Sequence, residues 1–146
     1  MRIIDYKRHL IVCLILFIAI ISISSVTGID YNDQVVDGLN STLDIEQAFN
    51  DSQINNKSVL LIFDQDTCYY CDLFKQDVLS DEDVQSQLNE NFIVVFVDIN
   101  EQYTVAEQLQ VMGTPTSVIL DSNGQEVARI DGYVSSDDFL DAIKEI

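Results

Sequence analysis

The strip FDQDTCYYCDLF, residues 63–74, contains two cysteines three positions apart, Cys68 and Cys71. Two thiols at this spacing can form a structural disulfide, supply half of a metal site, or exchange disulfides with other molecules. A three-residue loop adds little stability by loop closure, which argues against a purely structural role. Exchange requires a thiolate that attacks and a second thiol within reach of the same sulfur, and this spacing on a helix provides both.

The residues on either side of the cysteines indicate a strand followed by a helix. Val59–Phe63, VLLIF, is a continuous apolar run of strand length, as in a buried central strand. Cys71, Phe74 and Val78 then recur at the spacing of one helix face. A helix that begins at Cys68 directs free backbone N–H groups and the positive end of its dipole at that sulfur. This arrangement favours the thiolate over the thiol, whose pKa is ordinarily about 8.5.

The rest of the pattern predicts one α/β domain. We expect a helix opening at Ser41, with Ser41 as its N-cap and Asp44 three residues later, and a second helix capped by Ser80 with Asp83. Ser122-Asn123-Gly124 predicts a hairpin turn. Further strands are expected at 92–97, 117–121 and 126–130, and further helices at 103–112, with Met112 facing inward, and at 136–145. The first three strands alternate with helices and should be parallel, and the hairpin should add an antiparallel edge.

The first 28 residues differ from the remainder. Arg2, Lys7 and Arg8 precede the apolar run Leu10–Ile21, a pattern typical of a signal peptide or a signal anchor. Extended to residue 26, the run reaches the lower limit for spanning a bilayer, and we expect an apolar helix there. The predicted divisions are 1–28 as signal peptide or anchor, 29–40 as a polar tether, and 41–146 as the folded domain. The charge order places this domain outside the cytoplasm, anchored in the membrane or secreted after cleavage.

Charge and composition exclude several functions. The net charge is −18, and from residue 29 onward there are 24 acidic and 4 basic residues. Such a surface repels phosphate backbones, so nucleic-acid binding is excluded. The sole histidine, His9, precedes the apolar run. Hydrolytic mechanisms that need a histidine base are therefore excluded for the exported part.

From Ser41 to Ile146 the sequence resembles the thioredoxin superfamily, and more closely its exported thioredoxin-related members. The matching features are VLLIFDQDTCYYC, VLSDEDV, FIVVFVD, MGTPT before a strand, and DSNGQEVARIDGY. The Cys-x-x-Cys follows a buried strand, and a Gly-Thr-Pro follows some 44 residues later before another strand. The resemblance implies a three-layer α/β/α sandwich with a mixed central sheet.

The resemblance also implies roles for individual residues. Cys68 matches the exposed attacking cysteine and Cys71 the buried resolving one. Tyr69 and Tyr70 match the dipeptide that tunes the reduction potential; they are either surface residues without a role or part of a groove for client proteins. Thr114 and Pro115 match a cis-proline loop whose backbone pairs with the substrate chain. No cofactor is implied beyond the redox-active Cys68–Cys71 disulfide.

The sequence departs from the family at two positions near the cysteines. Typical thioredoxins carry a buried acid six residues before the first cysteine, where this chain has Ile62, and a tryptophan just before it, where this chain has Thr67. The usual proton acceptor for the buried cysteine is therefore missing. Asp64 and Asp66 lie nearby, and the sequence alone does not choose between them.

The prediction is an extracytoplasmic thiol–disulfide oxidoreductase. Asp64, Asp66 and Asp72 place negative charge near the thiolate, which predicts a potential on the reducing side. Its partners would be client proteins with thiols or disulfides, a redox partner that recharges the pair, and the membrane through residues 10–26. The alternative is copper binding or delivery on the same fold, for which Met112 is the one additional ligand near the proline loop.

Overall fold

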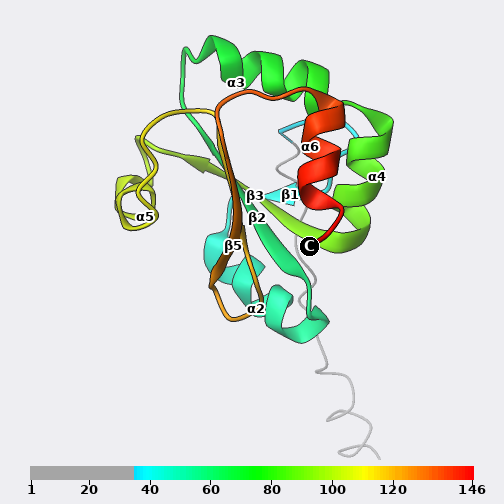
Figure 1. Cartoon of the computed structure of the whole chain (residues 1–146). Coiled ribbons are helices and arrows are strands. Elements are labelled where there is room, and N and C mark those ends of the chain that lie inside the picture. The colour runs from blue at the N-terminus through cyan, green and yellow to red at the C-terminus, as the bar shows by residue number, and fades with distance from the viewer. Residues whose placement is uncertain (1–34) are drawn as a thin grey trace, which may run out of the picture.

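The computed structural model describes residues 35–146, which form an α/β domain around a five-stranded mixed sheet (Figure 1). The strand order is β1-β3-β2-β4-β5. Strands β1 and β2 run parallel to β3, whereas β4 runs antiparallel to both β2 and β5. The elements are β1 Ser41–Thr42, α2 Ile45–Asn55, β2 Ser58–Asp64, α3 Tyr69–Leu73, the π-helix η1 Phe74–Val78, α4 Glu82–Asn91, β3 Phe92–Asp98, α5 Tyr103–Gln108, β4 Thr116–Leu120, β5 Glu126–Asp131 and α6 Ser136–Ile143.

Strand β2 lies at the centre of the sheet and is buried on both faces, which explains its unbroken apolar sequence. Its side chains alternate between two core clusters. Leu60 and Ile62 join the cluster that contains Phe74 of η1 and Phe139 of α6. Val59, Leu61 and Phe63 join the cluster on the opposite face, together with residues of α2 and α5. The helices thus cover both faces of the sheet, as expected for a three-layer sandwich (Figure 1).

The predicted direction of the third long strand is wrong. Strand β4 was expected to be parallel, but it pairs with β2 antiparallel, with Leu61 opposite Val118. The helix between β3 and β4 therefore returns the chain without a parallel crossover. The hairpin expected after β4 is present, with Gly124 at φ 80° in its turn and donating its N–H to the Asp121 carbonyl at 2.9 Å. That conformation favours glycine.

Both predicted helix caps are displaced by a few residues. Ser41 lies in β1 and pairs with Val94, and α2 is instead capped by Asp44, whose carboxylate accepts from the Gln47 N–H at 2.9 Å. Helix α4 is capped by Asp81 rather than Ser80. The Asp81 carboxylate accepts from the next turn, while the Ser80 hydroxyl donates to the Lys75 carbonyl at 2.8 Å. In both places an aspartate nearer the helix takes the role predicted for a serine.

The packed domain begins earlier than the predicted boundary at residue 41. Val36 and Leu39, placed in the polar tether by the sequence, are 6% and 0% exposed and belong to the core. The predicted N-terminal apolar helix and the anchor at residues 10–26 lie outside the described residues. Between residues 35 and 146, none of the helices combines the length and the apolarity needed to cross a bilayer.

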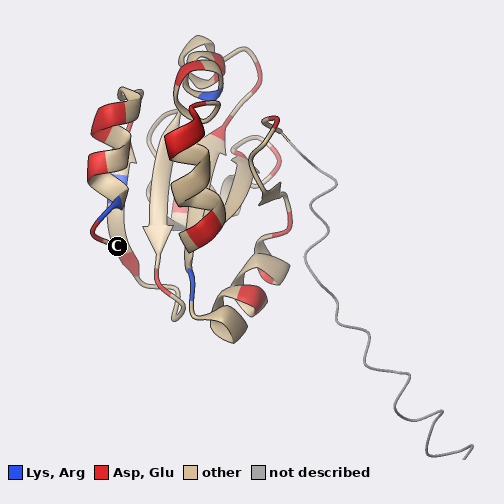
Figure 2. Cartoon of the chain, turned by 90° about the vertical axis from the view of Figure 1, so that its right-hand side faces the viewer, with Lys and Arg blue, Asp and Glu red and all other residues tan. Residues whose placement is uncertain are grey.

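Acidic residues dominate the surface of the described domain. Figure 2 shows Asp and Glu recurring along the helices, whereas Lys and Arg are few. Met112, expected to face inward at the end of the α5 region, is 95% exposed. Its helix ends at Gln108, and Gln110 adopts a left-handed conformation with φ 53°, so the helical periodicity behind the Met112 prediction stops before that residue.

Candidate active site

The two cysteines follow the C-terminal end of the central strand β2 and lie at the start of α3. Thr67 turns the chain between β2 and α3 with φ 63°, a left-handed conformation that β-branched residues rarely adopt. Cys68 is the N-cap of α3, and its sulfur accepts from the Cys71 N–H at 3.2 Å. The sequence thus folds locally as predicted, with the first cysteine at the helix start.

Cys68 and Cys71 form a disulfide, and their environments differ. Cys68 is 9% exposed and Cys71 is 2% exposed. The first residue is therefore the more accessible of the pair, while the second lies in the first turn of the helix and is enclosed. Burial in apolar surroundings disfavours a thiolate, so Cys71 needs a proton acceptor when it attacks a mixed disulfide at Cys68.

The loop that contains Thr114 and Pro115 lies directly against Cys68. The peptide bond between these two residues is cis. The Thr114 hydroxyl donates to the Cys68 sulfur at 3.3 Å, and the Thr114 carbonyl oxygen lies 3.6 Å from the same sulfur. The structure thus brings Thr114 and Pro115 to the cysteines, although 46 residues separate Thr114 from Cys68.

Three tyrosine rings gather at the start of α3, which follows Cys68 directly. Tyr69 and Tyr70 are 71% and 58% exposed, and their rings meet edge to face at 5.4 Å. Tyr133, which the sequence did not single out, lies 6.5 Å from the Tyr70 ring and donates its hydroxyl to Asp77 at 3.4 Å. Desolvation, followed by the charge of Asp77, raises the pKa of Tyr133. No sequence signal marked Tyr133 as part of the site. It follows Gly132, whose N–H donates to the Pro115 carbonyl at 2.8 Å and so holds this segment beside the proline loop.

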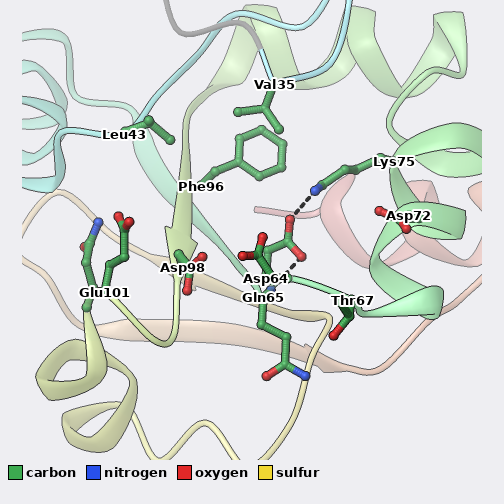
Figure 3. Close-up of a pocket in the computed structure, with 12 residues that line it drawn as sticks. Val35, Leu43, Asp64, Gln65, Thr67, Asp72, Lys75, Phe96, Asp98 and Glu101 are labelled. Atoms are coloured by element: carbon green, nitrogen blue, oxygen red, sulfur yellow. Dashed lines mark hydrogen bonds and ion pairs between the residues drawn. The ribbon is translucent and has the colours of Figure 1, made fainter.

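Asp64, the last residue of β2, approaches the disulfide from the inner side. A carboxylate oxygen of Asp64 and the sulfurs of Cys68 and Cys71 all lie within 4.8 Å of one another. Asp64 also forms an ion pair with Lys75 of η1 (Figure 3). Their side chains are only 17% and 25% exposed, respectively. The sequence offered Asp64 and Asp66 equally, and the structure brings Asp64 to the sulfurs, whereas Asp66 is exposed.

The same three residues form the one group in the described part of the chain that has the composition of a metal site. When reduced, the two thiolates and the Asp64 carboxylate offer three of the four ligands that zinc prefers. Lys75 already forms an ion pair with that carboxylate, so a metal ion would have to compete with the Lys75 ammonium group for it.

A Cys-x-x-Cys disulfide at a helix start, beside a cis-proline loop on this mixed sheet, places the protein among the thioredoxin-like proteins. The model of the family described as Thioredoxin-like domain matches residues 45–146, and the chain belongs to that family. Its fold and cysteine pair are those of a thiol–disulfide oxidoreductase.

Relatives with related sequences are named for disulfide exchange. The chain is 30% identical over 113 residues to the thiol:disulfide interchange protein DsbD of Photorhabdus laumondii. The matched region covers 74% of this chain and 19% of the relative. The chain is 31% identical over 103 residues to the DsbD of Campylobacter jejuni, which covers 68% and 18%. The chain therefore spans about a fifth of the length of these relatives.

Solved structures show the same fold. A thioredoxin from Thermus thermophilus aligns with a TM-score of 0.67 at 28% identity, covering 74% of this chain and 86% of that one. The oxidised C-terminal domain of Neisseria meningitidis DsbD aligns with a TM-score of 0.61 at 21% identity, covering 72% and 97%.

Proposed function

We propose that this domain exchanges disulfides with protein thiols outside the cytoplasm, with Cys68 as the attacking and Cys71 as the resolving residue. The supporting observation is the pair of donors at one sulfur: the Cys71 N–H at 3.2 Å and the Thr114 hydroxyl at 3.3 Å both point at Cys68. When the disulfide is reduced, these donors favour a thiolate at that atom. The relatives' name, thiol:disulfide interchange protein, agrees with this chemistry.

The step begins with attack of the Cys68 thiolate on a client disulfide. A mixed disulfide forms between Cys68 and the client, and one client sulfur leaves as a thiolate. Cys71 then attacks the Cys68 sulfur, the bond to the client breaks, and the client leaves reduced. The Cys68–Cys71 disulfide remains, and a second thiol-bearing partner must reduce it before the next cycle. The reverse sequence oxidises a client dithiol.

A client chain is proposed to bind beside the Thr114-Pro115 loop. Tyr69 and Tyr70 offer exposed aromatic surface at the start of the helix that Cys68 caps, and the Tyr133 ring lies 6.5 Å from that of Tyr70. Exposed aromatic rings can contact an apolar client segment at low cost in side-chain entropy. The membrane is proposed as a further contact, through residues 10–26.

The direction of transfer is proposed to be reducing. Asp72 is in the first turn of α3, and Asp64 lies beside the sulfurs, where Lys75 offsets part of its charge. Negative charge near a thiolate disfavours it, and a less stable reduced form gives a lower potential. The expected value lies nearer that of thioredoxin, about −270 mV, than that of the strong oxidant DsbA, about −120 mV.

Trapping tests the proposed exchange. In the full-length chain purified in detergent, Cys71→Ala should accumulate clients on Cys68 as mixed disulfides visible on non-reducing gels, and Cys68→Ala should accumulate none there. Equilibration of the wild type with glutathione buffers measures the potential and hence the direction. If Cys71→Ala captures no protein thiol, exchange with proteins is refuted.

Metal delivery is the second candidate, supported by the proximity of Asp64 to the two sulfurs. Two findings oppose it: Lys75 is paired with the carboxylate, and Met112, the ligand expected from the sequence, is 95% exposed. Metal analysis of the reduced protein separates the candidates. A stoichiometric content of copper or zinc would favour delivery.

A further inference from the structure

We infer that Asp64 is the proton acceptor for Cys71 during resolution, held in place by Lys75 and connected to solvent by an adjoining pocket. This inference rests on the proposed exchange function and identifies the group that the departure at Ile62 leaves open.

Asp64 is within reach of the sulfur that must lose a proton. Its carboxylate lies no more than 4.8 Å from Cys71, a distance that one intervening water or a small side-chain rotation converts into proton transfer. Cys71 is 2% exposed, so bulk water does not readily serve it directly. A buried thiol with a carboxylate at this distance has a proton acceptor within the protein.

Lys75 holds the carboxylate where it can act. The ammonium group pairs with one carboxylate oxygen, and the Gln65 N–H donates to the other at 2.7 Å (Figure 3). Lys75 belongs to η1, the same helical segment that follows Cys71, so the helix positions both the thiol and the partner of its acceptor. Lys75 is thus a positioning residue. Its positive charge also offsets the repulsion between the carboxylate and a developing thiolate.

A pocket of about 320 Å³ gives Asp64 access to water. Asp64, Thr67, Lys75, Asp98 and Glu101 contribute to its wall, and Asp98 lies beside Asp64, its partner in the register of β2 and β3 (Figure 3). Its volume and polar wall accommodate several waters. Neither cysteine is among the described residues that line it, whereas Asp64 both lines it and lies within 4.8 Å of the Cys71 sulfur, so Asp64 can pass a proton between Cys71 and the pocket.

The proton balance of the step is complete. The Cys71 thiol passes its proton to the Asp64 carboxylate while its sulfur attacks Cys68. The bond between the Cys68 and client sulfurs breaks, and the client leaves as a thiolate. Asp64 then returns the proton to pocket water. In the oxidising direction, protonated Asp64 supplies the proton to Cys71 as it leaves.

The aromatic disulfide DTNB separates the two thiol steps in the full-length reduced protein carrying Cys13→Ala, which leaves Cys68 and Cys71 as the two cysteines of the sequence. Attack by Cys68 releases one coloured thiolate, and attack by Cys71 on the mixed disulfide releases the second. We expect Asp64→Asn to slow the second phase by about a hundredfold, the lower end of general base catalysis, without slowing the first. Asp66→Asn removes an equal charge from an exposed residue of the same pocket and should leave the second phase unchanged.

The sign of the effect distinguishes this role from simple repulsion. If Asp64 acted only by its charge, its removal would favour the Cys71 thiolate and speed the second phase. Asp64→Glu, which keeps the carboxylate, should restore part of the rate. If circular dichroism shows that Asp64→Asn damages the fold, Asp64→Ser is used as the neutral variant instead. A neutral, folded variant that resolves as fast as Asp66→Asn overturns the inference and leaves the exchange function standing. Release of only one thiolate by the protein that carries Cys13→Ala alone would instead refute the proposed function.

Discussion

The hydroxyl of Thr114 provides the sharpest test of how Cys68 is activated. It donates to the Cys68 sulfur at 3.3 Å, and the Cys71 N–H donates to the same atom at 3.2 Å. Thr114→Val removes the first donor while keeping the shape of the side chain and leaves the second in place. A hydrogen bond to a charged group contributes about 1.5–3 kcal/mol, and one pKa unit corresponds to about 1.4 kcal/mol. Because Thr114 is partly exposed, we take the lower end.

The expected result is a rise of about one in the pKa of the Cys68 thiol in Thr114→Val. The thiolate fraction at neutral pH, and with it the rate of alkylation, should fall up to tenfold. Thr114→Ser keeps the hydroxyl and serves as the matched control. The assay is the pH dependence of iodoacetamide alkylation in a Cys13→Ala, Cys71→Ala background, where Cys68 is the remaining cysteine of the sequence. Equal pKa values in the valine and serine variants would refute the idea that this hydroxyl stabilises the thiolate.

Three further predictions concern the fold. Leu60→Ala should lower the free energy of unfolding by about 2–5 kcal/mol in urea titration, because Leu60 is fully buried on the central strand, whereas Val127→Ala, at a half-exposed position, should change it by less than about 0.5 kcal/mol. Asp81→Ala should cost about 1 kcal/mol by removing the cap of α4, and a larger loss in Ser80→Ala would show that the cap is misassigned. Arg129 lowers the pKa of Glu126 from its ordinary value of 4.5 through a hydrogen bond and its charge. The pair therefore stabilises the fold above pH 4.5 and loses that contribution as the pH falls through the lowered pKa. Glu126→Gln should reduce the loss of unfolding free energy on acidification, and an unchanged loss would contradict this.

The parts of the fold that could be predicted are those whose signals are local. The two central strands are continuous apolar runs, the hairpin has a glycine in its turn, and the helix at the cysteines has one apolar face. Each of these is decided by residues within about one turn or one strand of each other. The direction of β4 is not decided locally, because a helical connection of this length can lead into a strand that runs either parallel or antiparallel to β2. Strand β1 has only two residues and no pattern, so its pairing with β3 was invisible.

The helix caps show how close competitors defeat a pattern. Ser41 and Asp44 both suit an N-cap, and so do Ser80 and Asp81. The choice depends on which residue is drawn into another contact: Ser41 enters the sheet, and Ser80 turns back to the Lys75 carbonyl. These contacts join segments that the sequence alone does not bring together.

The geometry of β2 explains why an acid at position 64 can serve where the family places one at position 62. Side chains alternate along a strand, so positions 62 and 64 point to the same face of the sheet, roughly 7 Å apart. Ile62 fills the core beneath the helix that starts at the cysteines, whereas Asp64 lies at the strand end, where Lys75 and the pocket are within reach. A carboxylate at position 62 would need its charge compensated inside an apolar cluster, at considerable desolvation cost. At position 64 the same group keeps its ion pair and its water while remaining within 4.8 Å of both sulfurs. The departure at Ile62 thus moves the acid along one face of the strand without removing it from the reacting atoms.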